Sequence, residues 1–135
     1  MKTYDFAYGR GRKEFSIDES LVIKEVRTEE FTPMSDIKQG VLDAIYNPIG
    51  CEPIDKIIKP GDTVAFICND PTRVANSYDF MPVLVNKFNK LGVKDEDMHI
   101  VFALGTHRPM TDEEMVKAVG KDVASRLKMY NSLCN

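Results

Sequence analysis

Two nearly continuous apolar runs stand out in the pattern of hydrophobic and polar positions along this chain. They cover residues 63–69 and 98–104 and are rich in β-branched and aromatic side chains. Runs of this kind, bounded by turn residues, are typical of parallel strands that are covered on both faces. Between them, residues 78–91 repeat apolar side chains at helical spacing and end at Gly92. The pattern predicts a strand–helix–strand unit whose two strands are parallel neighbours.

Weaker patterns on either side of this unit complete an α/β order. Residues 3–8 and 14–16 predict two short strands around a glycine–arginine loop, which forms either a hairpin or an open connection. A further short strand is predicted at 21–26. Helices are predicted at 37–46, at 53–58 (a short helix or a turn), at 115–119 and at 122–129. We therefore expect a single α/β domain over residues 1–135, Rossmann-like and three-layered, with a mostly parallel sheet and a short N-terminal β hairpin.

Composition and charge narrow the setting. With 43% hydrophobic and 29% charged residues, the 135-residue chain has a globular composition. Its formal net charge of -3 and its lack of a Lys/Arg cluster argue against a nucleic-acid partner. The longest apolar runs are too short to cross a membrane, and the N-terminus lacks the apolar core of a signal peptide. We expect a cytoplasmic protein without a membrane segment.

The three cysteines give no sign of a disulfide framework or of a metal site. They are odd in number, and their spacing at 51, 68 and 134 is unlike that of metal ligands. Cys68 lies inside the first apolar run and is expected to be part of the core.

Polar motifs follow both apolar runs at the point where each strand is expected to end. Asp70-Pro71-Thr72-Arg73 follows the first run, and Gly105-Thr106-His107-Arg108-Pro109 follows the second. Because parallel neighbouring strands end at the same edge of a sheet, both motifs are expected on one edge, where open α/β sheets bind ligands.

The residue types in these motifs suit an anionic substrate and a proton transfer. Asp70 can orient an imidazole or a hydroxyl, Arg73 offers a fork of donors for a carboxylate or phosphate, and His107 titrates near neutral pH. The first motif is also an ordinary turn sequence, so a purely structural role is the alternative for Asp70 and Arg73.

The remaining motif residues would assist in binding. Gly105 allows a close backbone approach, Thr106 can donate from its hydroxyl and its N–H, and Arg108 adds a second cation beside the histidine. His99 begins the second strand, at the opposite edge, and is expected to be structural or solvent-facing. The sequence Gly9-Arg10-Gly11-Arg12 lacks the strand–helix context of a dinucleotide fingerprint.

These residues resemble a known family. Tyr8-Gly9, Asn69-Asp70-Pro71-Thr72-Arg73 and Ala103-Leu104-Gly105-Thr106-His107-Arg108-Pro109-Met110-Thr111 are similar to the N-terminal domain of the nickel-pincer lactate racemases. The resemblance implies interconversion of 2-hydroxy-acid stereoisomers with a nickel pincer nucleotide. It implies that His107 is the general acid/base on the substrate hydroxyl. It further implies that Asp70 and Arg73 support the site and contact anionic groups, with Thr72, Thr106 and Arg108 as neighbours.

Parts of the family pattern lie outside these 135 residues. In the family, a second domain brings the lysine that tethers the cofactor, the nickel-binding histidine and the second catalytic histidine. Ser132 also stands where the family is expected to have a histidine. The resemblance therefore implies a partner C-terminal domain, whether the chain is a piece of a longer enzyme, a naturally shortened product or half of a split one.

Two functions remain open at this point. In the first, the chain is the cleft domain of a 2-hydroxy-acid racemase and is inactive alone, because racemisation needs a proton acceptor on each face of the stereocentre. In the second, it is a non-catalytic module that binds a small carboxylate or a nucleotide phosphate, or docks a partner domain. An apolar face left open for an absent domain would also favour self-association.

Overall fold

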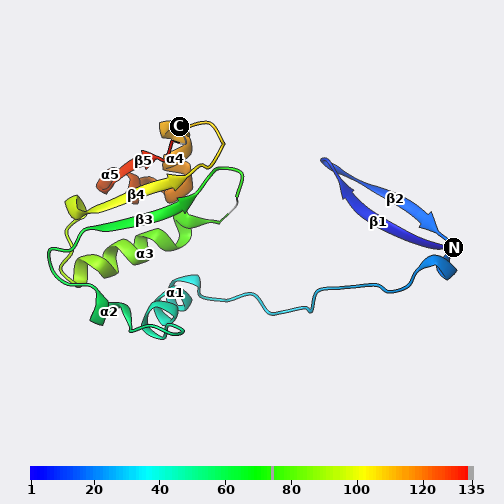
Figure 1. Cartoon of the computed structure of the whole chain (residues 1–135), viewed down its shortest axis with the longest axis horizontal. Coiled ribbons are helices and arrows are strands. Elements are labelled where there is room, and N and C mark those ends of the chain that lie inside the picture. The colour runs from blue at the N-terminus through cyan, green and yellow to red at the C-terminus, as the bar shows by residue number, and fades with distance from the viewer. Residues whose placement is uncertain (74, 134–135) are drawn as a thin grey trace. The chain divides into compact units, whose positions relative to one another are not determined.

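The computed structural model describes residues 1–73 and 75–133. The chain divides into two compact units, Met1–Pro33 and Met34–Asn135, and Figure 1 shows the elements of each. The expectation of a single domain over residues 1–135 stays a prediction.

The first unit is built on an antiparallel hairpin. Strands β1 (Lys2–Tyr8) and β2 (Gly11–Ile17) pair from Lys2 with Ile17 to Tyr8 with Gly11. Gly9, at a φ of 59°, supplies the left-handed conformation that the two-residue turn requires. The predicted hairpin is thus confirmed.

The strand predicted at residues 21–26 is wrong. Leu21, the first residue of the predicted strand, belongs to a short 3-10 helix, η1 (Glu19–Leu21). No regular element follows as far as Val26. Glu25 accepts a hydrogen bond from the Tyr4 hydroxyl at 2.7 Å and forms an ion pair with Lys2. Side-chain contacts to β1, and not a ladder of backbone hydrogen bonds, therefore hold this segment.

The second unit contains a parallel three-stranded sheet in the order β3-β4-β5. Its elements, in chain order, are α1 (Ile37–Tyr46), α2 (Ile54–Ile57), β3 (Val64–Asn69), α3 (Ser77–Lys90), η2 (Asp95–Asp97), β4 (Met98–Ala103), α4 (Asp112–Val119), α5 (Lys121–Arg126) and β5 (Lys128–Asn131). The α/β fold with its parallel sheet, the strand–helix–strand unit and the helix at 37–46 are confirmed.

The end of the chain differs from the prediction. The helix expected at 122–129 ends at Arg126, and β5 follows it and pairs with β4 from Lys128 to Asn131. Leu127, only 4% exposed, packs into the core and ends the helix in an extended conformation. Burial of this side chain outweighs the weak helical preference of the residues that follow.

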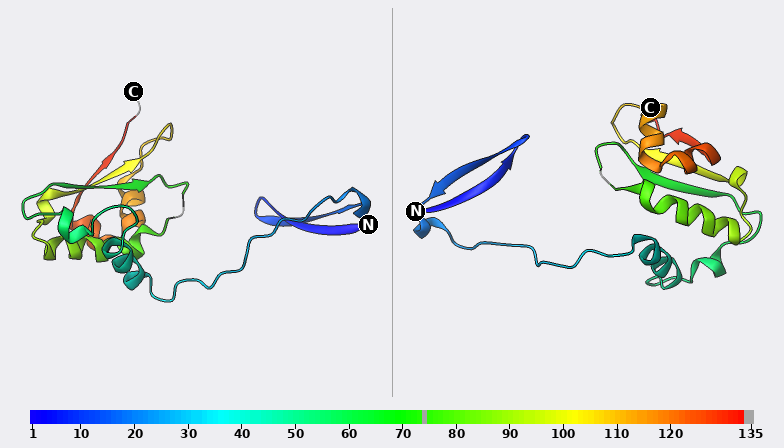
Figure 2. Two further views of the ribbon diagram at one scale, coloured as in Figure 1. Left: turned by 60° about the horizontal axis from the view of Figure 1, so that its bottom comes forward. Right: turned by 180° about the vertical axis from the view of Figure 1, so that it is seen from behind.

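The hydrophobic core lies between the sheet and one layer of helices. In Figure 2, α3, α4 and α5 lie against the same face of the sheet. Alternate strand residues point into this layer, and the core consists mainly of Cys68, Met81, Val85, Phe88, Val93, Met98, Ile100, Phe102, Leu104, Met110, Met115, Val119, Val123 and Leu127. The expected core position of Cys68 is confirmed, and burial raises the pKa of its thiol.

No described element of the second unit covers the opposite face of the sheet. Ile67 in the middle of β3 is 67% exposed, and Tyr130 on β5 is 48% exposed. Within this unit, the expectation that both faces of both strands are covered thus holds for one face only, because both helical connections of the unit run on the same side. Among the described residues, no helix has the length and hydrophobicity needed to cross a membrane.

Candidate functional site at the carboxyl edge of the sheet

The register of β3 and β4 brings the two polar motifs to one edge. Asn69, the last residue of β3, pairs with Ala103, the last residue of β4. The loops that begin at Asp70 and Leu104 therefore leave the sheet side by side, as Figure 1 shows. This is the arrangement that the sequence predicts for its two motifs.

The first loop is a tight turn organised by Asp70. The Asp70 carboxylate accepts hydrogen bonds from the Thr72 backbone N–H at 2.8 Å and from the Thr72 hydroxyl at 2.5 Å. The Arg73 N–H donates to the Asp70 carbonyl at 3.2 Å. These bonds lower the pKa of Asp70, and the charges of His107 and Arg73 add to the effect. Asp70 is therefore ionised, and its carboxylate interacts electrostatically with His107.

The second loop presents its side chains to solvent. The His107 N–H donates to the Leu104 carbonyl at 2.9 Å, and Gly105 takes a φ of 57°. A Cβ on Gly105 would meet no other atom within 4 Å, so its glycine suits the left-handed turn and leaves open space for a ligand. Thr106 and His107 are both exposed.

Arg108 is engaged within the fold. Its guanidinium donates to both carboxylate oxygens of Glu114, at 2.8 and 2.7 Å, and to the Pro109 carbonyl at 2.9 Å. Glu114 and Thr111 form a capping box at the start of α4. The Arg108 guanidinium holds the pKa of Glu114 at about 2. Arg108 thus fastens the loop to α4, and its expected role beside a ligand stays a prediction.

Two residues near the end of the chain support the second loop, a role that the sequence does not predict for either of them. The Asn131 side-chain amide accepts from the Met110 N–H and donates to the Met110 carbonyl, both at 3.0 Å. The Ser132 hydroxyl accepts from the Leu104 N–H at 3.0 Å. Asn131 is the last residue of β5 and Ser132 follows it, so the pairing of β5 with β4 brings both beside the second loop.

A cleft of about 530 Å³ opens beside the first loop. Asp70 and Arg73 line it together with the start of α3 and one side of α4, whereas His107 is outside its lining. Within residues 1–73 and 75–133, no group of three or more His, Cys, Asp or Glu side chains is placed to hold a metal ion. Of the motif residues, the exposed Arg73 and the exposed Thr106 have side chains that can donate to an anion at this edge.

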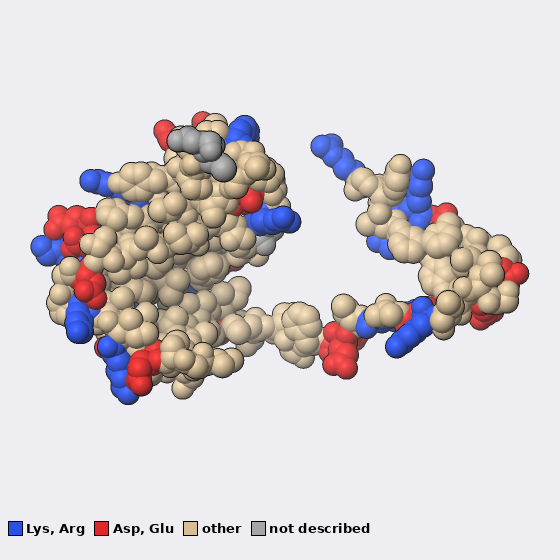
Figure 3. All heavy atoms as spheres, viewed as in Figure 1, with Lys and Arg blue, Asp and Glu red and all other residues tan. Residues whose placement is uncertain are grey.

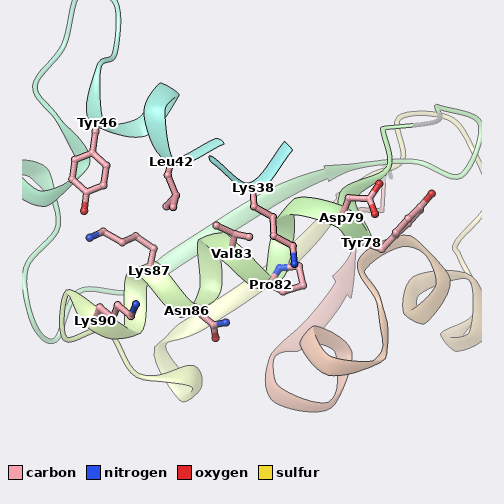
Figure 4. A pocket seen from close by; sticks show the side chains of 10 residues that line it. All are labelled: Lys38, Leu42, Tyr46, Tyr78, Asp79, Pro82, Val83, Asn86, Lys87 and Lys90. Carbon is pink, nitrogen blue, oxygen red and sulfur yellow. The ribbon is translucent and has the colours of Figure 1, made fainter. Parts of the chain in front are cut away.

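Two other clefts are of similar size and contain none of the motif residues. One, of about 670 Å³, lies between α1 and α3 and is lined by Leu42, Pro82, Val83 and three lysines (Figure 4). The other, of about 690 Å³, lies within the first unit, between the hairpin and residues 21–27. The three clefts are too similar in volume for size to identify the candidate site. We choose the cleft beside the first loop because motif residues line it.

The fold defines a class of protein, the parallel α/β domains, and open sheets of this class generally bind ligands at the carboxyl ends of their strands. The chain belongs to the lactate racemase N-terminal domain family, whose model matches residues 8–135. The predicted family is thereby confirmed.

Two relatives are lactate racemases. The one from Lactiplantibacillus plantarum is 28% identical over 88 residues, which is 65% of this chain and 20% of the relative. The one from Thermoanaerobacterium thermosaccharolyticum is 24% identical over 125 residues, 91% of this chain and 29% of the relative. This chain thus spans less than a third of the length of either.

A solved structure shares the fold. It is the lactate racemase apoprotein from Thermoanaerobacterium thermosaccharolyticum, with a TM-score of 0.78 at 21% identity. The match covers 98% of this chain and 30% of that one.

Proposed function

We propose that this chain is the N-terminal substrate and cofactor cleft domain of a racemase acting on lactate or a related 2-hydroxy acid. His107 is its general acid/base and exchanges a proton with the substrate hydroxyl. The observation that carries the proposal is the pairing of Asn69 with Ala103, which brings a carboxylate, an arginine and a histidine to one edge of the sheet.

The other motif residues bind and position. Arg73 is exposed, forms no ion pair with the described residues and binds the carboxylate of the substrate or a phosphate. Asp70 fixes the turn through Thr72 and keeps a negative charge near the imidazole. Gly105 and Thr106 border the ligand, and Arg108 acts through its hold on α4.

The described residues fit only part of the nickel pincer nucleotide that the family resemblance implies. Arg73 and Thr106 suit its phosphate or carboxylate groups, whereas no cluster of metal ligands is present among the described residues. When bound, this cofactor supplies the acceptor and donor for hydride. We therefore assign no residue of this chain to the nickel and propose that a partner C-terminal domain provides those ligands.

The 135-residue chain alone is expected to have no racemase activity. Its edge carries one histidine, and a stereocentre has two faces that each need a proton acceptor. A clear rate of lactate racemisation by this chain with the cofactor supplied would contradict the proposal.

The alternative is a module that binds a small carboxylate or nucleotide phosphate without catalysis. The cleft beside Arg73 favours it as much as the racemase role, because both need anion binding at that arginine. What separates them is His107, which the module does not need.

Calorimetric titration with lactate, nicotinate mononucleotide and phosphate tests the site. Arg73→Ala is expected to weaken binding at least about tenfold, since it removes a charge-assisted fork of hydrogen bonds. His107→Ala is expected to weaken lactate more than phosphate, because only lactate brings a hydroxyl. Lys94→Ala, at the opposite edge of the sheet, removes the same charge and serves as the control. Unchanged binding in both site variants would refute the proposed site, and a loss limited to Arg73→Ala would favour the module.

A further inference from the structure

The open face of the sheet is a largely apolar surface that no described element of the second unit covers. Its side chains alternate with those of the core along each strand, and they are Ala65, Ile67 and Asn69 on β3, His99, Val101 and Ala103 on β4, and Lys128 and Tyr130 on β5. Figure 3 shows charged side chains around the border of this unit and none over the middle of β3 and β4. Parallel sheets are normally covered on both faces, so this surface is unusual for its fold.

The topology indicates where a further strand has to lie to bring a helix over this face. Both existing connections, from β3 to β4 and from β4 to β5, run on the core side. Because such crossovers are right-handed, a new strand beyond β5 would place its helix on the core side again. A strand that returns to the free edge of β3 would place its helix on the open face.

The two edges of the sheet differ in a way that agrees with this choice. β5 begins with Lys128, an exposed charge of the kind that protects a true sheet edge. β3 reads Val-Ala-Phe-Ile-Cys-Asn and carries no charge along its length. The β3 edge therefore has the sequence of an inner strand.

We propose that the open face and the β3 edge dock a helix followed by a parallel strand. They come from the part of a lactate racemase that lies beyond the segment matched by this chain. That part is long, since this chain spans only 20% and 29% of the two relatives. A second copy of this chain could pair with the edge or cover the face, but only a helix–strand unit does both. The inference rests on the family and not on the proposed chemistry.

Docking at β3 would complete the candidate site. The strand order would reverse between β3 and the new strand, and ligands of open α/β sheets bind at such a switch point. The loop of Asp70 and Arg73 leaves β3 and would form one wall of that crevice. The partner would then provide the other wall of the crevice, next to β3.

Two hybrid proteins test the docking. In each, residues 1–135 replace the matched segment of one of the two relatives. Amide hydrogen exchange of residues 64–69 is compared between the hybrid and the 135-residue chain. We expect exchange of the β3 amides that do not bond to β4 to slow at least about tenfold, with little change in β5. Protection gained at β5 and not at β3, or at neither, would overturn the inference, as would failure of both hybrids to fold.

A pair of lysine substitutions isolates the open face. Ile67→Lys is expected to lower the unfolding temperature of the hybrid sharply and that of the 135-residue chain little, because Ile67 is exposed only in the latter. Ile49→Lys, in a loop and fully exposed, is the control and is expected to have little effect in either. Equal effects of Ile67→Lys in both proteins would overturn the inference. If the 135-residue chain is a dimer in sedimentation equilibrium and Ile67→Lys makes it a monomer, a second copy is the occupant instead. Neither readout depends on racemase activity or anion binding, so either proposal can fail without the other.

Discussion

The two ends of the parallel strands, called here the amino edge and the carboxyl edge, use arginine in opposite ways. At the amino edge, Arg126 donates to Asp95 through two nitrogens at 2.9 Å, to Asn86 at 2.9 Å and to Asn89 at 2.6 Å. At the carboxyl edge, the Arg73 side chain is exposed and forms no ion pair with the described residues. A guanidinium whose three nitrogens all donate within the fold stabilises it, whereas one with free donors is available to a ligand.

Arg108 shows that the position of an arginine in a motif does not decide whether it stabilises the fold or is available to a ligand. Arg108 directly follows the candidate histidine, yet its guanidinium donates to Glu114 and to the Pro109 carbonyl. In this respect it resembles Arg126 at the amino edge. The contrast therefore predicts stability effects at Arg126 and Arg108 and a binding effect at Arg73.

The largest effect is expected for Arg126→Ala. The substitution removes four side-chain hydrogen bonds that join α3, η2 and α5, and leaves the partly buried Asp95 without its cation. We expect the free energy of unfolding to fall by about 2 to 3 kcal/mol. Urea unfolding measures it, and Lys121→Ala, exposed at the start of the same helix, is the control. A loss equal to that of the control would show that the network does not stabilise the fold.

Two glycines with positive φ allow a second comparison of the edges. A Cβ on Gly92, at the amino edge, would lie 2.8 Å from Cγ of Pro60, whereas one on Gly105 would meet nothing within 4 Å. Gly92→Ala is expected to cost about 2 kcal/mol of unfolding free energy, and Gly105→Ala about 1 kcal/mol, since only the first adds a collision to backbone strain. Equal losses in thermal unfolding would contradict the difference in packing.

The sequence predicts the framework of this fold from its strongest patterns. The runs at 63–69 and 98–104 and the helix between them follow from periodicity, and the shared edge of both motifs follows from the handedness of the connection. The strand β5 could not be predicted in this way, because Lys128–Asn131 is four residues long and owes its conformation to pairing with β4. The short run at 21–26 looks like a strand, but side-chain contacts to β1, and not backbone pairing, hold it.

The candidate site, like the fold, is predictable from the sequence only in part. Local sequence predicts which residue types stand at the edge. It does not predict that Glu114, six residues from Arg108, pairs with its guanidinium, or that Asn131 bonds to Met110, 21 residues before it. Contacts of this kind depend on how the loops pack, and they separate the arginine that is free for a ligand from the one that is not.

A smaller and pH-dependent effect is expected at the link between Arg108 and Glu114. The folded-state pKa of Glu114 is about 2, below its ordinary value of 4.5, so its contribution is complete above about pH 4.5 and is lost as the pH falls towards 2. Glu114→Gln is therefore expected to destabilise the chain at pH 7 and to make less difference at pH 3. Arg108→Ala should behave similarly, since the arginine is the main cause of the shift. Urea unfolding at the two pH values measures it. A Glu114→Gln effect that is the same at both pH values would contradict the assignment.

The smallest effect on stability is expected for Arg73→Ala, and it is the most informative about function. Because Arg73 donates no side-chain hydrogen bond to a described residue, its removal should leave urea unfolding within error of the unsubstituted chain. The same variant should lose most of its affinity for phosphate and lactate in the titration. Arg108→Ala is the matched control at the same edge, with the opposite expectation of reduced stability and a smaller change in affinity. If Arg73→Ala instead destabilised the chain and left affinity intact, Arg73 would belong with Arg126 as a structural residue, and the anion site would have to lie elsewhere on the edge.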